Sequence, residues 1–190
     1  MGRRLENYII HPDPCGSSDE LLARLRPNHR MERLQFGYLG VDEDLDYRIA
    51  EDRQRMVDLG LGYEDLARAI ELLFENDDET VNGNPIVRRR YIHSPVCPWG
   101  DYTTVSIFVL AQLVTEVYVI NRETCPPQVS DLLIWDCGLD PDYYPKVVEE
   151  DWVMIFSDLH PHLIREHQFL EGLETPYRVE PARAKRYLGL

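Results

Sequence analysis

Apolar residues recur at helical spacing over residues about 42–76. Leu45 and Ile49 share one face of the earlier part of this region, and Leu66 and Ile70 share one face of the later part. A link of two or three residues separates the two parts, as in antiparallel helices joined by a short turn. The pattern therefore predicts a helical hairpin.

The pattern changes over residues about 85–156, where short segments are rich in β-branched and aromatic residues. The segments IVRRRYIH, TTVSIFVL, EVYVINRE and VVEEDWVMIF have the length and composition of strands. Asn82 and Gly83, just before the first segment, form a dipeptide that favours a tight turn. We predict a mainly antiparallel sheet of about 4–5 strands in this region.

Helical signals return over residues about 157–190. The segment SDLHPHLIREHQFLEG has a capping residue at Ser157 or Asp158 and a helix-ending glycine at Gly172. A last helix is expected to start at Pro181, because proline is favoured in the first turn of a helix.

Near the N-terminus, Ser17 and Glu20 have the spacing of a capping box, which predicts one more helix. Helices thus precede and follow a run of strands, and this order is typical of an α+β fold rather than a repeated βαβ unit. A chain of 190 residues has the usual length of one domain. We predict a single globular domain over residues 1–190.

The charge of the chain limits its partners. Asp and Glu number 34 against 20 Lys and Arg, which gives a formal net charge of −14. Such a chain repels phosphate backbones and anionic lipids, so we expect neither general nucleic-acid binding nor membrane association. It has no apolar run of the roughly 18 residues that a spanning helix needs and no stretch typical of a signal peptide, so a cytoplasmic location is expected.

An acidic surface attracts basic proteins. Tyr143 and Tyr144 lie in the proline-flanked segment DPDYYPK, and loop aromatics among acidic residues are typical of contact residues. The common nucleophile, nucleotide-binding and metalloprotease motifs are absent from the sequence, which argues against an enzyme without deciding the question. Our leading hypothesis is a protein-binding or regulatory accessory protein without catalytic activity.

Two loops with the same spacing support a different hypothesis. His11 precedes Cys15 by four residues, and His93 precedes Cys97 by four residues, each pair in a proline-containing segment. Two histidines and two cysteines form a common zinc ligand set. If the loops meet, they would make a structural or hydrolytic zinc site, and zinc is the one cofactor that the sequence suggests. The alternative is that these are ordinary packing residues at strand ends.

A third hypothesis concerns an anionic ligand. Arg88 and Arg90 would point to the same face of a strand, with His93 close by, and paired arginines bind carboxylate or phosphate groups. The same arginines could instead pair with acidic residues of the helical hairpin.

The helix expected near the C-terminus contains His160, His162 and His167. In one continuous helix His162 faces away from the apolar stripe and His167 lies near it, while His160 and His167 are about 10 Å apart. We therefore expect that the three histidines do not converge, with His167 at the boundary of the core and the other two solvated.

Overall fold

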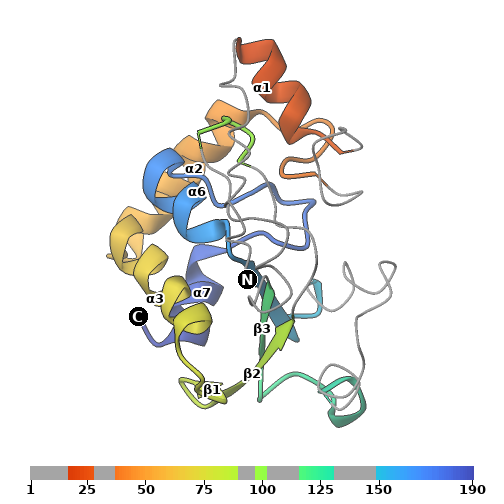
Figure 1. The fold of residues 1–190 in the computed structure, drawn as a ribbon, viewed down its shortest axis with the longest axis vertical. Helices are drawn as coiled ribbons and strands as arrows, with labels where there is room; N and C mark the ends of the chain where they lie inside the picture. Colours follow the sequence, from red (N-terminus) through yellow and green to blue (C-terminus); the bar gives the residue numbers. More distant parts are fainter. Residues whose placement is uncertain (1–16, 28–36, 90–96, 102–115, 131–148) are drawn as a thin grey trace, which may run out of the picture.

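The computed structural model describes residues 17–27, 37–89, 97–101, 116–130 and 149–190. Its elements are α1 (Ser18–Leu25), α2 (Leu45–Asp58), α3 (Tyr63–Glu75), β1 (Thr80–Val81), β2 (Asn84–Arg89), β3 (Glu116–Ile120), β4 (Val153–Ser157), α6 (His160–His167) and α7 (Pro181–Leu188). This succession of helices, strands and helices confirms the predicted α+β fold (Figure 1).

Local capping interactions account for where the early helices begin. The Ser17 hydroxyl accepts a hydrogen bond from the Glu20 amide at 3.2 Å, as the capping-box spacing predicts. The Asp44 carboxylate caps α2 by accepting from the Tyr47 amide at 2.8 Å. Just past α2, Gly60 has a φ of +64°, a left-handed conformation common after a helix end. None of the helices in the described part of the chain has the length and hydropathy needed to cross a membrane.

The four strands form one antiparallel sheet in the order β1-β2-β3-β4. Asn82 and Gly83 connect β1 to β2, and both have positive φ, 48° and 78°. Two such residues in sequence make the turn whose twist suits a tight hairpin. The Asn-Gly turn signal in the sequence is thereby confirmed.

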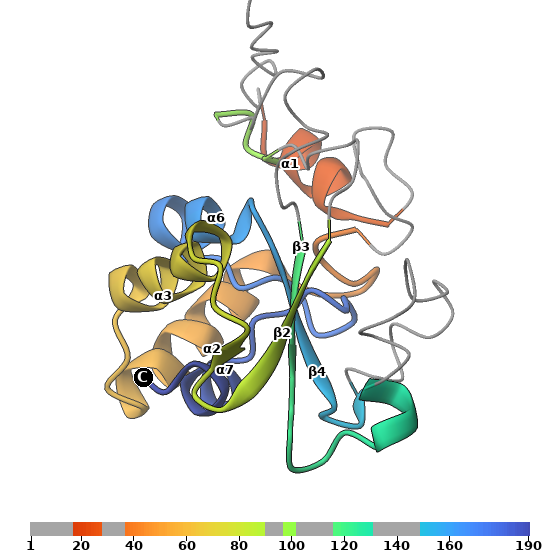
Figure 2. The same ribbon diagram turned by 60° about the horizontal axis from the view of Figure 1, so that its bottom comes forward.

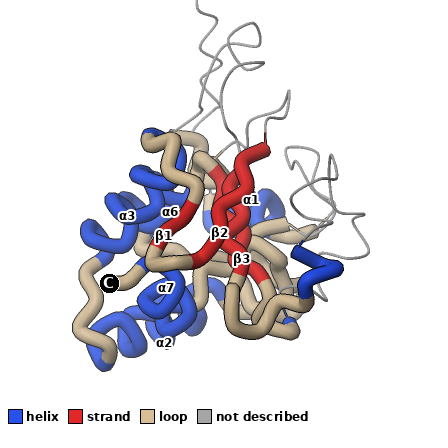
Figure 3. Tube along the Cα trace, turned by 90° about the horizontal axis from the view of Figure 1, so that it is seen from below, coloured by secondary structure: helices blue, strands red, loops and turns tan. Residues whose placement is uncertain are grey.

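Every residue of β3 and β4 is buried, because both faces of the sheet are covered. Val117 and Phe156 face a core formed with α2, α3, α6 and α7. Tyr118 and Ile155 face the other way, toward a second cluster that includes Tyr177. Figures 2 and 3 show the four helices together on one side of the strands. The helical hairpin therefore packs on the sheet, as predicted.

A buried ion pair joins α2 to the segment that precedes α7. The Arg178 guanidinium donates to both Asp52 carboxylate oxygens, one of them at 3.0 Å, and also to the Glu171 carbonyl oxygen. The two charged side chains are only 5% and 1% exposed. A charge buried to this degree needs a partner, so the pair fixes the position of the segment against α2.

Two details differ from the predicted elements. Ser157 is the last residue of β4 rather than a helix cap, and α6 ends at His167 because Gln168 adopts a left-handed conformation with a φ of 52°. The predicted helix to Gly172 is therefore too long. Residues 127–130, inside the predicted sheet region, are helical.

Candidate metal centre

A tight turn over residues 97–101 carries the first two functional side chains. The Gly100 amide donates to the Cys97 carbonyl oxygen at 2.9 Å, with Pro98 at the second turn position. Gly100 then takes a φ of +78°, which glycine adopts at little cost. The chain reverses over these residues, so the Asp101 carboxylate returns to hydrogen-bonding distance of the Cys97 thiol.

Contacts with three other parts of the fold hold this turn. The buried Arg24 of α1 donates to the Pro98 carbonyl oxygen at 3.3 Å. The Trp99 ring stacks on the His167 ring, with centroids 4.1 Å apart and planes 8° apart, and meets Phe169 edge-on. Cys97 is fully buried in the core cluster between α1 and α6. Packing and hydrogen bonds therefore fix the turn against both helices.

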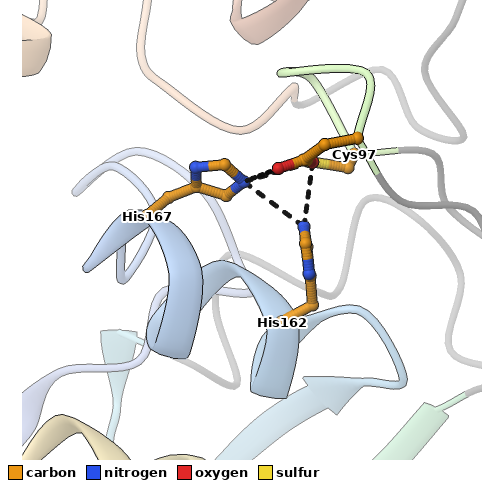
Figure 4. A group of neighbouring side chains, drawn as sticks. Cys97, His162 and His167 are labelled. Atoms are coloured by element: carbon orange, nitrogen blue, oxygen red, sulfur yellow. Dashed lines mark hydrogen bonds and ion pairs between the residues drawn. The ribbon is translucent and has the colours of Figure 1, made fainter. Parts of the chain in front are cut away.

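The helix α6 supplies two histidines near its C-terminal end. His167 is its last residue, and the Phe169 amide donates back to the Leu163 carbonyl oxygen at 3.1 Å. This bond pattern is a Schellman-type helix end. His162, five residues earlier, and His167 both direct their rings at the turn, and Figure 4 shows Cys97, His162 and His167 pointing toward one another.

Four donor atoms meet at this point: Cys97 Sγ, an Asp101 carboxylate oxygen, and the Nε2 atoms of His162 and His167. All of them lie within 4.8 Å of one another. His167 Nε2 is 3.5 Å from the sulfur, 3.3 Å from the other Nε2 and 3.1 Å from Asp101 Oδ2. His162 Nε2 is 3.0 Å from Asp101 Oδ1.

These separations match a tetrahedral metal site. Zinc bonds of about 2.0–2.3 Å to nitrogen, oxygen and sulfur place the corners of a tetrahedron about 3.3–3.8 Å apart. The separations given above, 3.0 to 3.5 Å, are near that range, and the remaining pairs of donor atoms are within 4.8 Å of each other. The cluster could therefore hold one metal ion.

The protonation of the cluster follows from its burial and its hydrogen bonds. Burial, followed by the hydrogen bond to Asp101, raises the pKa of the Cys97 thiol to about 12. Burial also lowers the pKa of His167, against the opposing charge of Asp101. Burial opposes ionisation of Asp101 itself, but the thiol hydrogen bond and the two histidines outweigh it and lower its pKa. At neutral pH the cluster therefore contains a thiol, a carboxylate and a neutral His167.

A pocket of about 540 Å³ opens beside the cluster. Its lining residues come mainly from α6 and its N-terminal flank: Glu71, Asp101, Asp158, Pro161, His162, Arg165 and Glu166. Arg165 donates to Glu64 and Glu71 at 2.8 and 2.9 Å, which ties α6 to α3 along one wall. The cluster is thus reachable from solvent on this side.

The structure brings one of the four residues of the zinc hypothesis into the cluster. Cys97 is a member, whereas His11, Cys15 and His93 lie outside the described residues. Whether the two predicted loops meet stays a prediction. Asp101, His162 and His167, the other three members, were not candidates in the zinc hypothesis drawn from the sequence.

Two expectations about the α6 histidines are wrong. His162 and His167 converge, with their Nε2 atoms 3.3 Å apart. His160 is fully buried rather than solvated: its Nδ1 accepts from the Ser157 amide at 2.6 Å, and its Nε2 lies 2.9 Å from the Tyr177 carbonyl oxygen. His160 thus connects the end of β4 to the segment before α7, apart from the cluster.

The other predicted site residues are only partly described. Arg88 donates to the carbonyl oxygens of Leu73 and Asp78 at 2.9 and 2.7 Å, at the C-terminal end of α3. Arg90 and His93 lie outside the described residues, so the anion site stays a prediction. Tyr143 and Tyr144 also lie outside them, and the protein-binding surface likewise stays a prediction.

Comparison of the chain with protein-family models, with curated proteins and with solved structures finds no match.

Proposed function

We propose that the protein is a zinc-binding domain in which Cys97, Asp101, His162 and His167 hold a single ion. The observation that supports this proposal is the convergence of four donor atoms of zinc-ligand type, from two segments more than sixty residues apart, all within 4.8 Å of one another. A thiol, two imidazole nitrogens and a carboxylate form a donor set that suits zinc.

The donor set favours zinc over the other common ions. Calcium and magnesium prefer oxygen ligands only, and a thiol with two imidazoles is unsuitable for them. Zinc accepts sulfur, nitrogen and carboxylate oxygen in one tetrahedral site. The fully buried Cys97 supplies the soft ligand, which selects against hard cations.

The ion would join the turn over residues 97–101 to α6. The turn already contacts α1 through Arg24, so zinc at this point would tie together three separate stretches of chain. A ligand that binds only the folded state stabilises it by mass action, by about 2.7 kcal/mol at a hundred times the dissociation constant. Zinc should therefore raise the melting temperature.

Metal analysis of the purified protein tests the proposal. We expect one equivalent of zinc in the native protein after reconstitution and dialysis, and a large loss in Cys97→Ser. The matched control is Cys125→Ser, which replaces a partly buried free thiol outside the cluster. Because Trp99 stacks on His167, zinc should also change tryptophan fluorescence, and Trp99→Phe should remove that change.

Two outcomes would overturn the proposal. The first is a native protein that binds no zinc after reconstitution. The second is equal zinc content in Cys97→Ser and Cys125→Ser, which would place the metal elsewhere. In either case the four side chains would form only a hydrogen-bonded network that links the turn to α6.

A further inference from the structure

The four ligands of the proposed zinc site differ sharply in exposure. Cys97 is fully buried, and the side chains of His162 and His167 are 13% and 12% exposed. The Asp101 side chain is 47% exposed. Cys97 is therefore the buried ligand, the two histidines are partly buried, and Asp101 is the most exposed of the four.

The exposed side is also the side that meets the pocket. Asp101 and His162 belong both to the cluster and to the pocket wall. A volume of about 540 Å³ lies within the range of sites for small molecules, roughly 300–1,000 Å³. A molecule in this pocket would reach the ion from the side of Asp101 and His162, without displacing the buried Cys97.

We infer that the zinc keeps an exchangeable position on the Asp101 side and hydrolyses a small carboxylic ester or amide bound in the pocket; this inference rests on the proposed zinc-binding function. Cys97, His162 and His167 form the permanent three-ligand set. Three protein ligands with a fourth position open to water distinguish catalytic zinc sites from closed structural ones, and such sites can expand to five ligands. Asp101 either yields its position or shares the ion with the incoming molecule.

The proposed reaction is hydrolysis by a zinc-bound water molecule. A water molecule at the exchangeable position loses a proton to solvent, and its oxygen attacks the carbonyl carbon. The bond from that carbon to the leaving oxygen or nitrogen breaks, and the leaving group takes up a proton. The ester or amide and one water become an acid and an alcohol or amine, with no oxidant or reductant.

The charges of the pocket restrict the substrate class. The charge of the zinc is balanced by the Cys97 thiolate and the Asp101 carboxylate. The remaining wall carries Glu71 and Glu166, and the guanidinium of Arg165 is already paired with acidic residues. A phosphate ester would meet repulsion there, so the pocket suits a neutral or positively charged carbonyl compound.

Cobalt substitution and acetohydroxamate, a small oxygen ligand for such metals, test the exchangeable position. We expect the visible spectrum of the cobalt protein to shift on addition of acetohydroxamate, with Cys125→Ser as a control that behaves like the native protein. Asp101→Ala, which retains the other three ligands, should still bind cobalt, and its spectrum should shift as well. If acetohydroxamate shifts the spectrum of Asp101→Ala but not that of the native protein, Asp101 fills the fourth position permanently. That result would overturn the inference while leaving zinc binding intact.

Hydrolysis tests the substrate class. The zinc protein should cleave p-nitrophenyl acetate faster than the metal-free protein, and added zinc should restore the rate after chelation. Cleavage of p-nitrophenyl phosphate should stay at background. Zinc binding at one equivalent without metal-dependent ester cleavage would refute the hydrolytic inference alone, and faster cleavage of the phosphate would refute the substrate class. Failure of the protein to bind zinc or cobalt would refute the inference together with the proposed function.

Discussion

The protonated state of Cys97 gives the sharpest prediction for zinc binding. Zinc binds the thiolate, so each ion that binds must displace the thiol proton. Burial, followed by the hydrogen bond to Asp101, raises the pKa of this thiol to about 12 in the metal-free protein. The thiol therefore keeps its proton at every pH at which the protein would normally be handled.

The magnitude follows from the displaced proton. While the thiol stays protonated, the apparent zinc association constant rises tenfold per pH unit, which is about 1.4 kcal/mol. With an ordinary cysteine, whose pKa is about 8.5, the apparent zinc association constant would hardly rise further above that pH. We therefore expect the apparent zinc association constant to rise about 100-fold between about pH 8.5 and pH 10.5, a rise that an ordinary thiol would not produce. His167 and Asp101 add no proton release there, because both pKa values lie below their usual values.

Competition with a chelator of known zinc affinity measures this dependence, and an indicator dye counts the released proton directly. The control is Cys97→Ala, which retains three ligands and should lose the tenfold rise per pH unit. A native curve that flattens between about pH 8 and pH 9, where an unperturbed thiol titrates, would refute the reasoning from burial. The same slope in the alanine variant would show that the proton comes from another group.

Three further predictions concern the fold and the turn. Asp52→Ala should leave Arg178 as an uncompensated buried charge and cost about 3–5 kcal/mol, measured as a lower melting temperature. Gly100→Ala should weaken zinc binding by roughly tenfold, because a side chain at a φ of +78° costs about 1–2 kcal/mol, which the metal-free variant relieves only by leaving the turn geometry that places Asp101 beside Cys97; chelator competition measures the loss. The hydrogen bond from Arg165 lowers the pKa of Glu71, so this pair adds stability above the unfolded-state pKa of about 4.3 that is lost as pH falls through the lower folded-state value. Glu71→Gln should therefore flatten the acid side of the stability curve in urea unfolding.

Each of these variants has a matched control on the same structural element or nearby. Asp58→Ala removes an exposed aspartate from α2 and should leave the melting temperature nearly unchanged. Gly60→Ala introduces a side chain at a φ of +64° far from the cluster and should not alter zinc affinity. Glu75→Gln replaces a more exposed glutamate of α3 and should retain the native acid profile. If a control variant shows the same change as the variant it is matched with, the physical cause given for that change is wrong.

Features encoded by neighbouring residues could be predicted from the sequence. The Ser17 cap depends on a hydroxyl three residues before Glu20, and the β1–β2 turn depends on the tolerance of Asn82 and Gly83 for positive φ. The regular spacing of apolar residues in the helical hairpin similarly reflects the burial of one face of each helix. Such signals lie within a few positions of the structure they determine, so one sequence is sufficient to find them.

The end of α6 could not be predicted in this way. A left-handed residue after a helix is usually glycine or asparagine, and Gln168 carries no such signal. Long-range contacts set the position of the end: Phe169 is fully buried, and the Val179 amide donates to the Leu170 carbonyl oxygen at 2.9 Å. The burial of this segment stops the helix before Gly172, the terminator that the sequence suggests.

The candidate metal centre could not be predicted either. Five positions along an ideal helix separate His162 and His167 by about 140° around the axis, so helical geometry alone argues against a shared site. The structure nevertheless places their Nε2 atoms 3.3 Å apart, beside Cys97 and Asp101 of the turn. Cys97 could be singled out from sequence as a ligand type, but its partners are set by tertiary packing.

In the protein without an ion, hydrogen bonds hold the candidate zinc ligands together, and these bonds define where the protons lie before zinc binds. Asp101 Oδ1 lies 3.0 Å from His162 Nε2, and Asp101 Oδ2 lies 3.1 Å from His167 Nε2. Because a carboxylate only accepts, each Nε2 carries a proton in this arrangement. Zinc needs the lone pair of Nε2, so each ring must give up its Nε2 proton when the ion binds. The thiolate that forms at Cys97 and the Asp101 carboxylate together balance the +2 charge of the ion, which favours the loaded state at a site whose thiol is fully buried.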